Sequence, residues 1–97
     1  MLPKWLDGRA AAQFGEEIAD DVRRVIPLEA SRIAKNPAKR LQKLMRVVEK
    51  TSSRSAQHPL NIYQKAKFAN ALRWSLKDSG YTADFVDEVV TLILARM

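Results

Sequence analysis

The sequence predicts an all-α protein, a compact bundle of four main helices. Apolar residues recur every three or four positions along most of the chain, which is the period of an α-helix. The β-branched residues fall within these periods instead of alternating, so no segment indicates a strand. Most of the three glycines and four prolines stand between the periodic segments. At 97 residues, the chain is expected to form a single helical domain, residues 1–97.

The first helix is expected at about 8–26. Its apolar side contains Phe14, Ile18 and Val22, and charged residues lie opposite. Gly15 interrupts this helix at a cost of about 1 kcal/mol relative to alanine, which indicates a kink or the close approach of another helix. Pro27 ends it, and a short extra helix at 28–35 has room to follow.

The second helix is expected at about 37–51. Asn36 can cap its free amide groups, and Pro37 suits the first helical position because proline has no amide to lose. The end is placed near Thr51, because the segment TSSRSAQH that begins there is polar and resembles a loop.

The last two helices are expected at about 60–79 and 83–96. Pro59 offers a helix start, and Gly80 stands where a left-handed residue ends a helix. Thr82 then caps the final helix.

The net charge of +6 is spread unevenly. Residues 1–30 carry a net charge of −2, residues 31–77 carry +11 and residues 78–97 carry −3. The middle of the chain is therefore far more basic than the total suggests.

The second predicted helix arranges its cations in one row. This row contains Lys39, Lys43, Arg46 and Lys50, and Arg54 would extend it if the helix continued. At 100° per residue the four lie within about 60° of one another. Leu41, Leu44, Met45 and Val48 are expected on the opposite, apolar side. Such a row is typical of a protein that binds a polyanion. The alternatives are a solvated face, a face neutralised by the acidic outer helices, or a membrane-surface helix, which the lack of aromatic anchors disfavours.

The third predicted helix carries a second stripe in which aromatic and basic residues alternate. Its members are Tyr63, Lys67, Asn70, Trp74 and Lys77. Bases stack on such rings in proteins that bind single-stranded nucleic acid. The alternatives are that the two rings pack against a neighbouring helix or contact a partner protein.

The final helix has an apolar arc wider than one neighbour needs. It is expected to be central to the core or shared with a second copy of the chain. The candidate subunit interface consists of Phe85, Val89, Leu92 and Ile93.

Catalytic chemistry is not expected. The chain has no cysteine, one histidine (His58) and no glycine-rich phosphate loop. The carboxylates Glu16 and Asp20 lack the accompanying histidine of a di-metal site. We therefore expect no enzyme activity, no metal and no cofactor.

The sequence also predicts a soluble, cytoplasmic protein with no membrane partner. It opens without the apolar run of a secretory signal, and its most apolar stretch, from Val89 to Ala95, is far shorter than the ~20 residues that cross a bilayer.

Together these features predict a small non-catalytic helical interaction module that binds an acidic partner, either nucleic acid or an acidic protein surface. The residues expected to bind it are Lys39, Lys43, Arg46 and Lys50, with Lys67, Trp74 and Lys77 secondary. The alternative is a structural protein that forms a homodimer through its apolar C-terminal helix.

Overall fold

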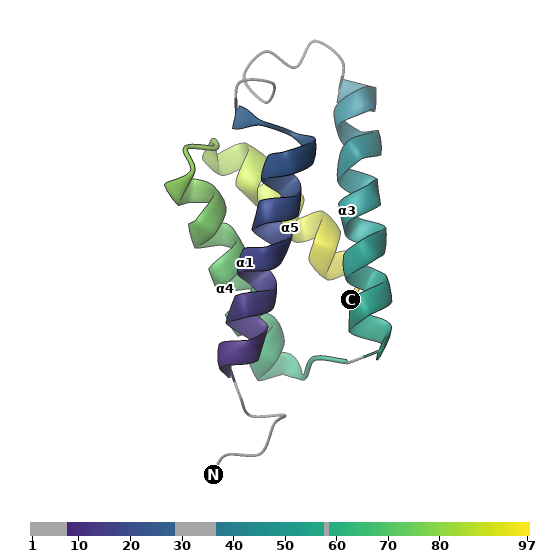
Figure 1. The fold of residues 1–97 in the computed structure, drawn as a ribbon, viewed down its shortest axis with the longest axis vertical. Coiled ribbons are helices and arrows are strands. Elements are labelled where there is room, and N and C mark those ends of the chain that lie inside the picture. The colour runs from purple at the N-terminus through teal and green to yellow at the C-terminus, as the bar shows by residue number, and fades with distance from the viewer. Residues whose placement is uncertain (1–7, 29–36, 58) are drawn as a thin grey trace.

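The computed structural model describes residues 8–28, 37–57 and 59–97. It contains the helices α1 (Gly8–Val25), α3 (Pro37–Gln57), α4 (Ile62–Asp78) and α5 (Ala83–Ala95), with no strand in the described ranges (Figure 1). The predicted all-α class and its four main helices are confirmed. The cap expected at Asn36 lies outside the described residues, as does the short helix at 28–35 apart from Leu28. None of the described helices is long and apolar enough to span a bilayer.

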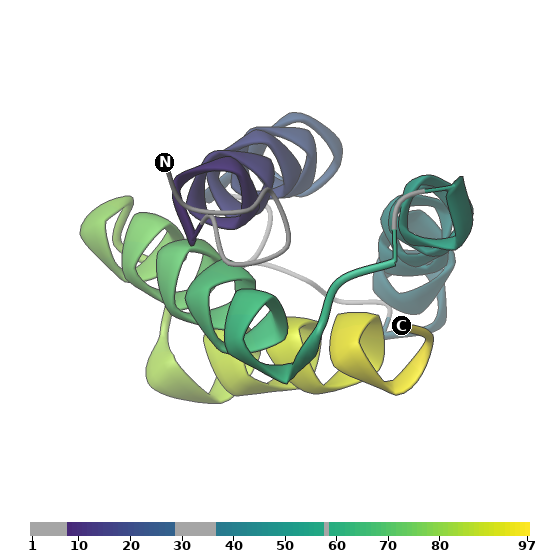
Figure 2. The ribbon, with the colours of Figure 1, turned by 90° about the horizontal axis from the view of Figure 1, so that it is seen from below.

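The four helices pack in an uneven arrangement. Helices α1 and α4 lie side by side, and α5 runs across the bundle on the face away from α1 (Figure 2). Helix α3 stands to one side, where it contacts α1 and α5 (Figure 2). This position leaves much of the surface of α3 open.

Gly15 permits the close packing of α1 on α4. A Cβ atom at this position would lie 2.5 Å from the carbonyl oxygen of Phe68 and 3.0 Å from the backbone nitrogen of Leu72. Helix α1 continues through Gly15 without a break. Of the two interpretations of this glycine, the close approach of another helix is therefore the correct one.

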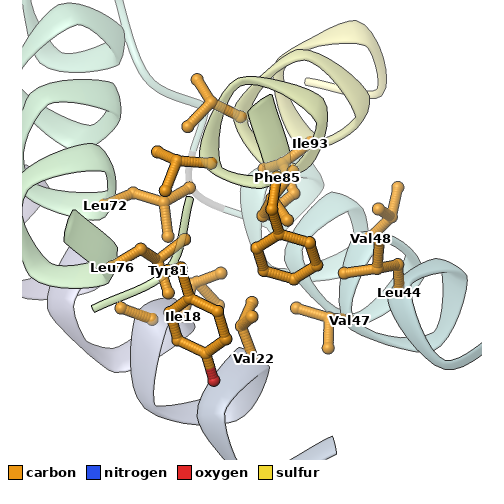
Figure 3. Packing of buried hydrophobic residues seen from close by; sticks show 14 of the residues in the cluster. Ile18, Val22, Leu44, Val47, Val48, Leu72, Leu76, Tyr81, Phe85 and Ile93 are labelled. Carbon is orange, nitrogen blue, oxygen red and sulfur yellow. The ribbon is translucent and has the colours of Figure 1, made fainter. Parts of the chain in front are cut away.

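One buried cluster joins all four helices (Figure 3). Its members include Ile18 and Val22 of α1, Leu44, Val47 and Val48 of α3, Phe68, Leu72 and Leu76 of α4, and Val86, Val89, Val90 and Ile93 of α5. The wide apolar arc of α5 is used inside this cluster, between α3 and α4.

The turn between α4 and α5 has the predicted chemistry. Gly80 adopts a φ of 102°, and its N–H donates to the carbonyl of Lys77 at 2.9 Å. The N–H of Tyr81 donates to the carbonyl of Leu76 at 3.3 Å, which completes a Schellman motif. Thr82 caps α5 by accepting a hydrogen bond of 3.3 Å from the N–H of Phe85.

Helix α3 extends to Gln57, so the end predicted near Thr51 is wrong. Thr51 and Ser55 are buried on the same side of the helix as Leu44 and Val48. The Thr51 hydroxyl donates to the carbonyl of Val47 at 2.8 Å, which satisfies it inside the core. Packing therefore carries the helix through a segment whose polar composition resembles a loop.

Helix α4 begins at Ile62, two residues later than predicted, because its cap is Asn61. The Asn61 side chain accepts from the N–H of Gln64 at 2.8 Å, and the Gln64 side chain accepts from the N–H of Asn61 at 3.1 Å. This reciprocal pair is a capping box. It gives hydrogen-bond partners to two backbone N–H groups, which a helix that began directly after Pro59 would leave without partners.

Candidate polyanion-binding surface

The predicted row of cations forms one exposed ridge along α3. We call the residues Lys39, Lys43, Arg46 and Lys50 the cationic ridge, and all four side chains are exposed. The core side of α3 carries Leu44 and Val48, which are buried. Spacings of four, three and four residues therefore turn the cations away from the core.

Acidic residues of α1 reach only one end of the ridge. The Nζ atom of Lys50 lies 2.9 Å from Oδ2 of Asp21. Lys43 and Arg46 form no ion pair with any residue that the structure describes. Neutralisation by the acidic outer helices thus affects the C-terminal end of the ridge and leaves its middle open.

Arg54 stands in the part of α3 that the sequence prediction left out. Its guanidinium lies 2.9 Å from Oε2 of Glu17 and 4.3 Å from the ring centroid of Phe14. The side chain is thereby turned toward α1 and does not extend the ridge outward. The signal in the sequence that could have revealed this extension is the spacing of Thr51 and Ser55, which continues the helical period of Leu44 and Val48.

An apolar strip flanks the ridge. Leu41 was expected on the core side of its helix, but its side chain is 44% exposed. Together with Ala38, Gln42 and the half-buried Met45 it lines a shallow hollow of about 300 Å³. The expectation that Leu41 faces the core is wrong, because α3 lies at the edge of the bundle and none of the helices that the structure describes covers that flank.

The alternating stripe of α4 is exposed along its whole length. We call the residues Tyr63, Lys67, Asn70, Trp74 and Lys77 the aromatic stripe, and each is exposed. Tyr63 is 49% and Trp74 is 62% exposed. The Nζ atom of Lys67 lies 5.6 Å from the Tyr63 ring centroid, and that of Lys77 lies 5.8 Å from the Trp74 ring centroid. The Tyr63 ring lies against the start of α1, where a Cβ at Gly8 would meet it at 3.3 Å, so packing against a neighbouring helix, one of the alternatives for the two rings, accounts for part of the Tyr63 surface.

The ridge and the stripe are not brought together. Helices α3 and α4 lie on opposite sides of the molecule, with α1 and α5 between them (Figures 1 and 2). The outer side of α1 carries the exposed carboxylates Glu16, Glu17 and Asp20. Arg9 and Arg24 are exposed on the same helix. The molecule therefore presents two separate cationic faces with a surface of mixed charge between them.

The candidate subunit interface lies largely inside the single chain. Phe85, Val89 and Ile93 are buried, and Leu92 is half-buried. Their contacts are with the other helices of the same chain. A second copy could reach the three buried side chains only if the core opened.

The two candidate surfaces consist of charged, polar and aromatic side chains. No group of three His, Cys, Asp or Glu residues that could hold a metal ion occurs in the described ranges. Three carboxylates of α1 are used in ion pairs: Glu17 contacts Arg54, Asp20 contacts Arg23, and Asp21 contacts both Arg24 and Lys50. What these exposed surfaces can do is bind oppositely charged or stacking groups.

Comparison with known proteins gives no relative. No protein-family model matches the chain, and neither a curated protein nor a solved structure matches it.

Proposed function

We propose that this protein is a small non-catalytic interaction module that binds the phosphate backbone of nucleic acid through the cationic ridge of α3. One observation carries this proposal: Lys43 and Arg46 are exposed in the middle of the ridge and have no acidic partner among the described residues. Helix α3 carries six cations against one carboxylate, Glu49. Such a surface attracts a polyanion and releases the counterions that the polyanion has condensed.

The cationic ridge suits the phosphate backbone of nucleic acid better than its bases. Its four members are amine and guanidinium groups, which donate to phosphate oxygens. The last of them, Lys50, lies 11 positions after the first, Lys39, or about 16 Å along the helix. The ridge contains no aromatic ring that could stack on a base. We therefore expect binding that depends on salt and little on sequence.

A direct binding assay tests the proposal. A labelled duplex of about 20 base pairs is titrated with the protein between about 50 and about 200 mM salt, and binding is followed by fluorescence anisotropy. Three or four phosphate contacts predict that the affinity falls about 40-fold to 150-fold over this range. The double variant Lys43→Gln and Arg46→Gln should bind more weakly and lower the salt slope by about 1.8.

A second double variant controls for net charge. Gln13→Glu on α1 and Thr91→Glu on α5 also lower the net charge by two, at exposed positions away from the ridge. This protein should bind with the salt slope of the wild type. Equal losses of affinity in both double variants would mean that binding depends on the net charge of the protein and not on the position of the cations. No binding at about 50 mM salt would end the nucleic-acid proposal, and binding of polyglutamate in its place would assign the ridge to an acidic protein.

A further inference from the structure

The aromatic stripe of α4 is a surface of a different kind from the ridge. Tyr63 and Trp74 are exposed on the same side of the helix, and Ile62, which lies about 100° around the helix from Tyr63, is 89% exposed. Large aromatic side chains normally bury most of their surface. One edge of the Tyr63 ring lies against Gly8 of α1, and about half or more of each ring's residue surface remains available to a partner.

The spacing of the rings suits an extended chain. Trp74 lies 11 positions after Tyr63, which places their Cα atoms about 16 Å apart along the helix and about 20° apart around it. Asn70 lies between them on the same stripe, with Lys67 and Lys77 beside the two rings. A ligand that follows the helix would meet a ring, a cation, an amide, a second ring and a second cation.

The positive charge of the aromatic stripe indicates what kind of ligand it binds. Neither Lys67 nor Lys77 forms an ion pair within the described ranges. The stripe contains no carboxylate, and Asp78, the sole acid of α4, lies at the helix end. A dry protein interface depletes lysine at its centre, whereas this surface sets a lysine beside each ring.

We propose that the aromatic stripe binds single-stranded nucleic acid, with bases stacking on Tyr63 and Trp74 and phosphates contacting Lys67 and Lys77. Every base has a flat face that stacks on an aromatic ring, and lysines neutralise the backbone between stacked bases. Bases of a duplex are stacked on one another and cannot reach these rings. The stripe therefore distinguishes single strands from duplexes, which the cationic ridge cannot do, and this inference goes beyond the proposed function.

Tryptophan fluorescence tests the inference at the ring itself. In a Trp5→Phe background Trp74 is the one remaining tryptophan. Titration with an oligothymidine of about 12 nucleotides should quench its emission to saturation, and the matching duplex should not. Trp74→Ala should lower the affinity for the oligothymidine about five-fold to one hundred-fold without any change of charge. Trp74→Phe should retain most of the affinity, because a ring remains.

The matched control is Ile62→Ala, which removes another exposed apolar side chain from the same helix and should bind like the wild type. Wild-type affinity in Trp74→Ala, or equal quenching by the duplex, would overturn the inference and leave the ridge proposal standing. Conversely, if Lys43→Gln with Arg46→Gln leaves duplex binding intact, the ridge proposal fails. Loss of oligothymidine binding in Trp74→Ala would then still support the stripe.

Discussion

Replacing Gly15 by alanine tests the packing that holds α1 on α4. The added Cβ would stand 2.5 Å from the carbonyl oxygen of Phe68. That oxygen belongs to the backbone of α4, so it cannot rotate away as a flexible side chain would. The two helices must separate, which loosens contacts along the interface.

The expected change in the free energy of unfolding is the balance of two opposing effects. Alanine in a helix interior is favoured over glycine by about 1 kcal/mol. Overpacking a close interface costs about 1–3 kcal/mol, and a clash with backbone belongs at the upper end of that range. We expect Gly15→Ala to lower the free energy of unfolding by about 1–2 kcal/mol, which corresponds to about 4–16 °C in Tm for a chain of this size.

Circular dichroism at the helical band, followed through thermal and urea unfolding, measures this loss. Gly8→Ala is the matched control on the same helix. Its Cβ would meet Cγ of Lys67 at 3.1 Å and the Tyr63 ring at 3.3 Å, both in side chains at the surface that can move. Its stability should change by less than about 0.5 kcal/mol. A Gly15→Ala protein as stable as the wild type would show that the helices do not approach as described.

Three further substitutions test local features by the same unfolding measurements. Asn61→Ala removes the α4 cap and should cost about 1 kcal/mol. Gly80→Ala places a Cβ at a φ of 102° and should cost about 1–2 kcal/mol, so an unchanged Tm would contradict the left-handed turn. Tyr81→Phe removes the hydroxyl that donates to the carbonyl of Ile26 at 2.5 Å and should cost about 1 kcal/mol. Burial raises the pKa of Tyr81 above its ordinary value of 10.0, against the opposing charge of Arg23. The unfolded phenol therefore ionises first, and wild-type stability should fall more steeply above pH 10.0 than that of Tyr81→Phe.

Local chemistry made most of the fold predictable. Gly80 and Thr82 ended and began their helices as predicted, because a left-handed glycine and a threonine cap act within a few residues. Segments decided by tertiary contacts were less predictable. The polar run after Thr51 resembles a loop by composition, yet burial of Thr51 and Ser55 against the core keeps it helical.

For the candidate surfaces too, the features set by helical period were predictable and those set by tertiary packing were not. Helical period alone places Lys39, Lys43 and Arg46 on one side of α3, and the structure has them exposed. Sequence could not show that Asp21 reaches Lys50 alone among the ridge cations, because that pairing depends on how α1 packs beside α3. Nor could it show that α3 and α4, which carry the ridge and the aromatic stripe, lie on opposite sides of the molecule, since helix order along the chain does not fix which helices meet (Figure 2).

Mapping the bound duplex on the protein tests the ridge proposal most directly. At 11.0 kDa the protein suits heteronuclear NMR, and amide shifts can be followed while an unlabelled duplex is added. We predict that the largest shifts cluster on α3 around Lys39, Lys43 and Arg46, and that they disappear as salt is raised. Shifts centred on another helix, or spread evenly over the surface, would contradict binding through the cationic ridge.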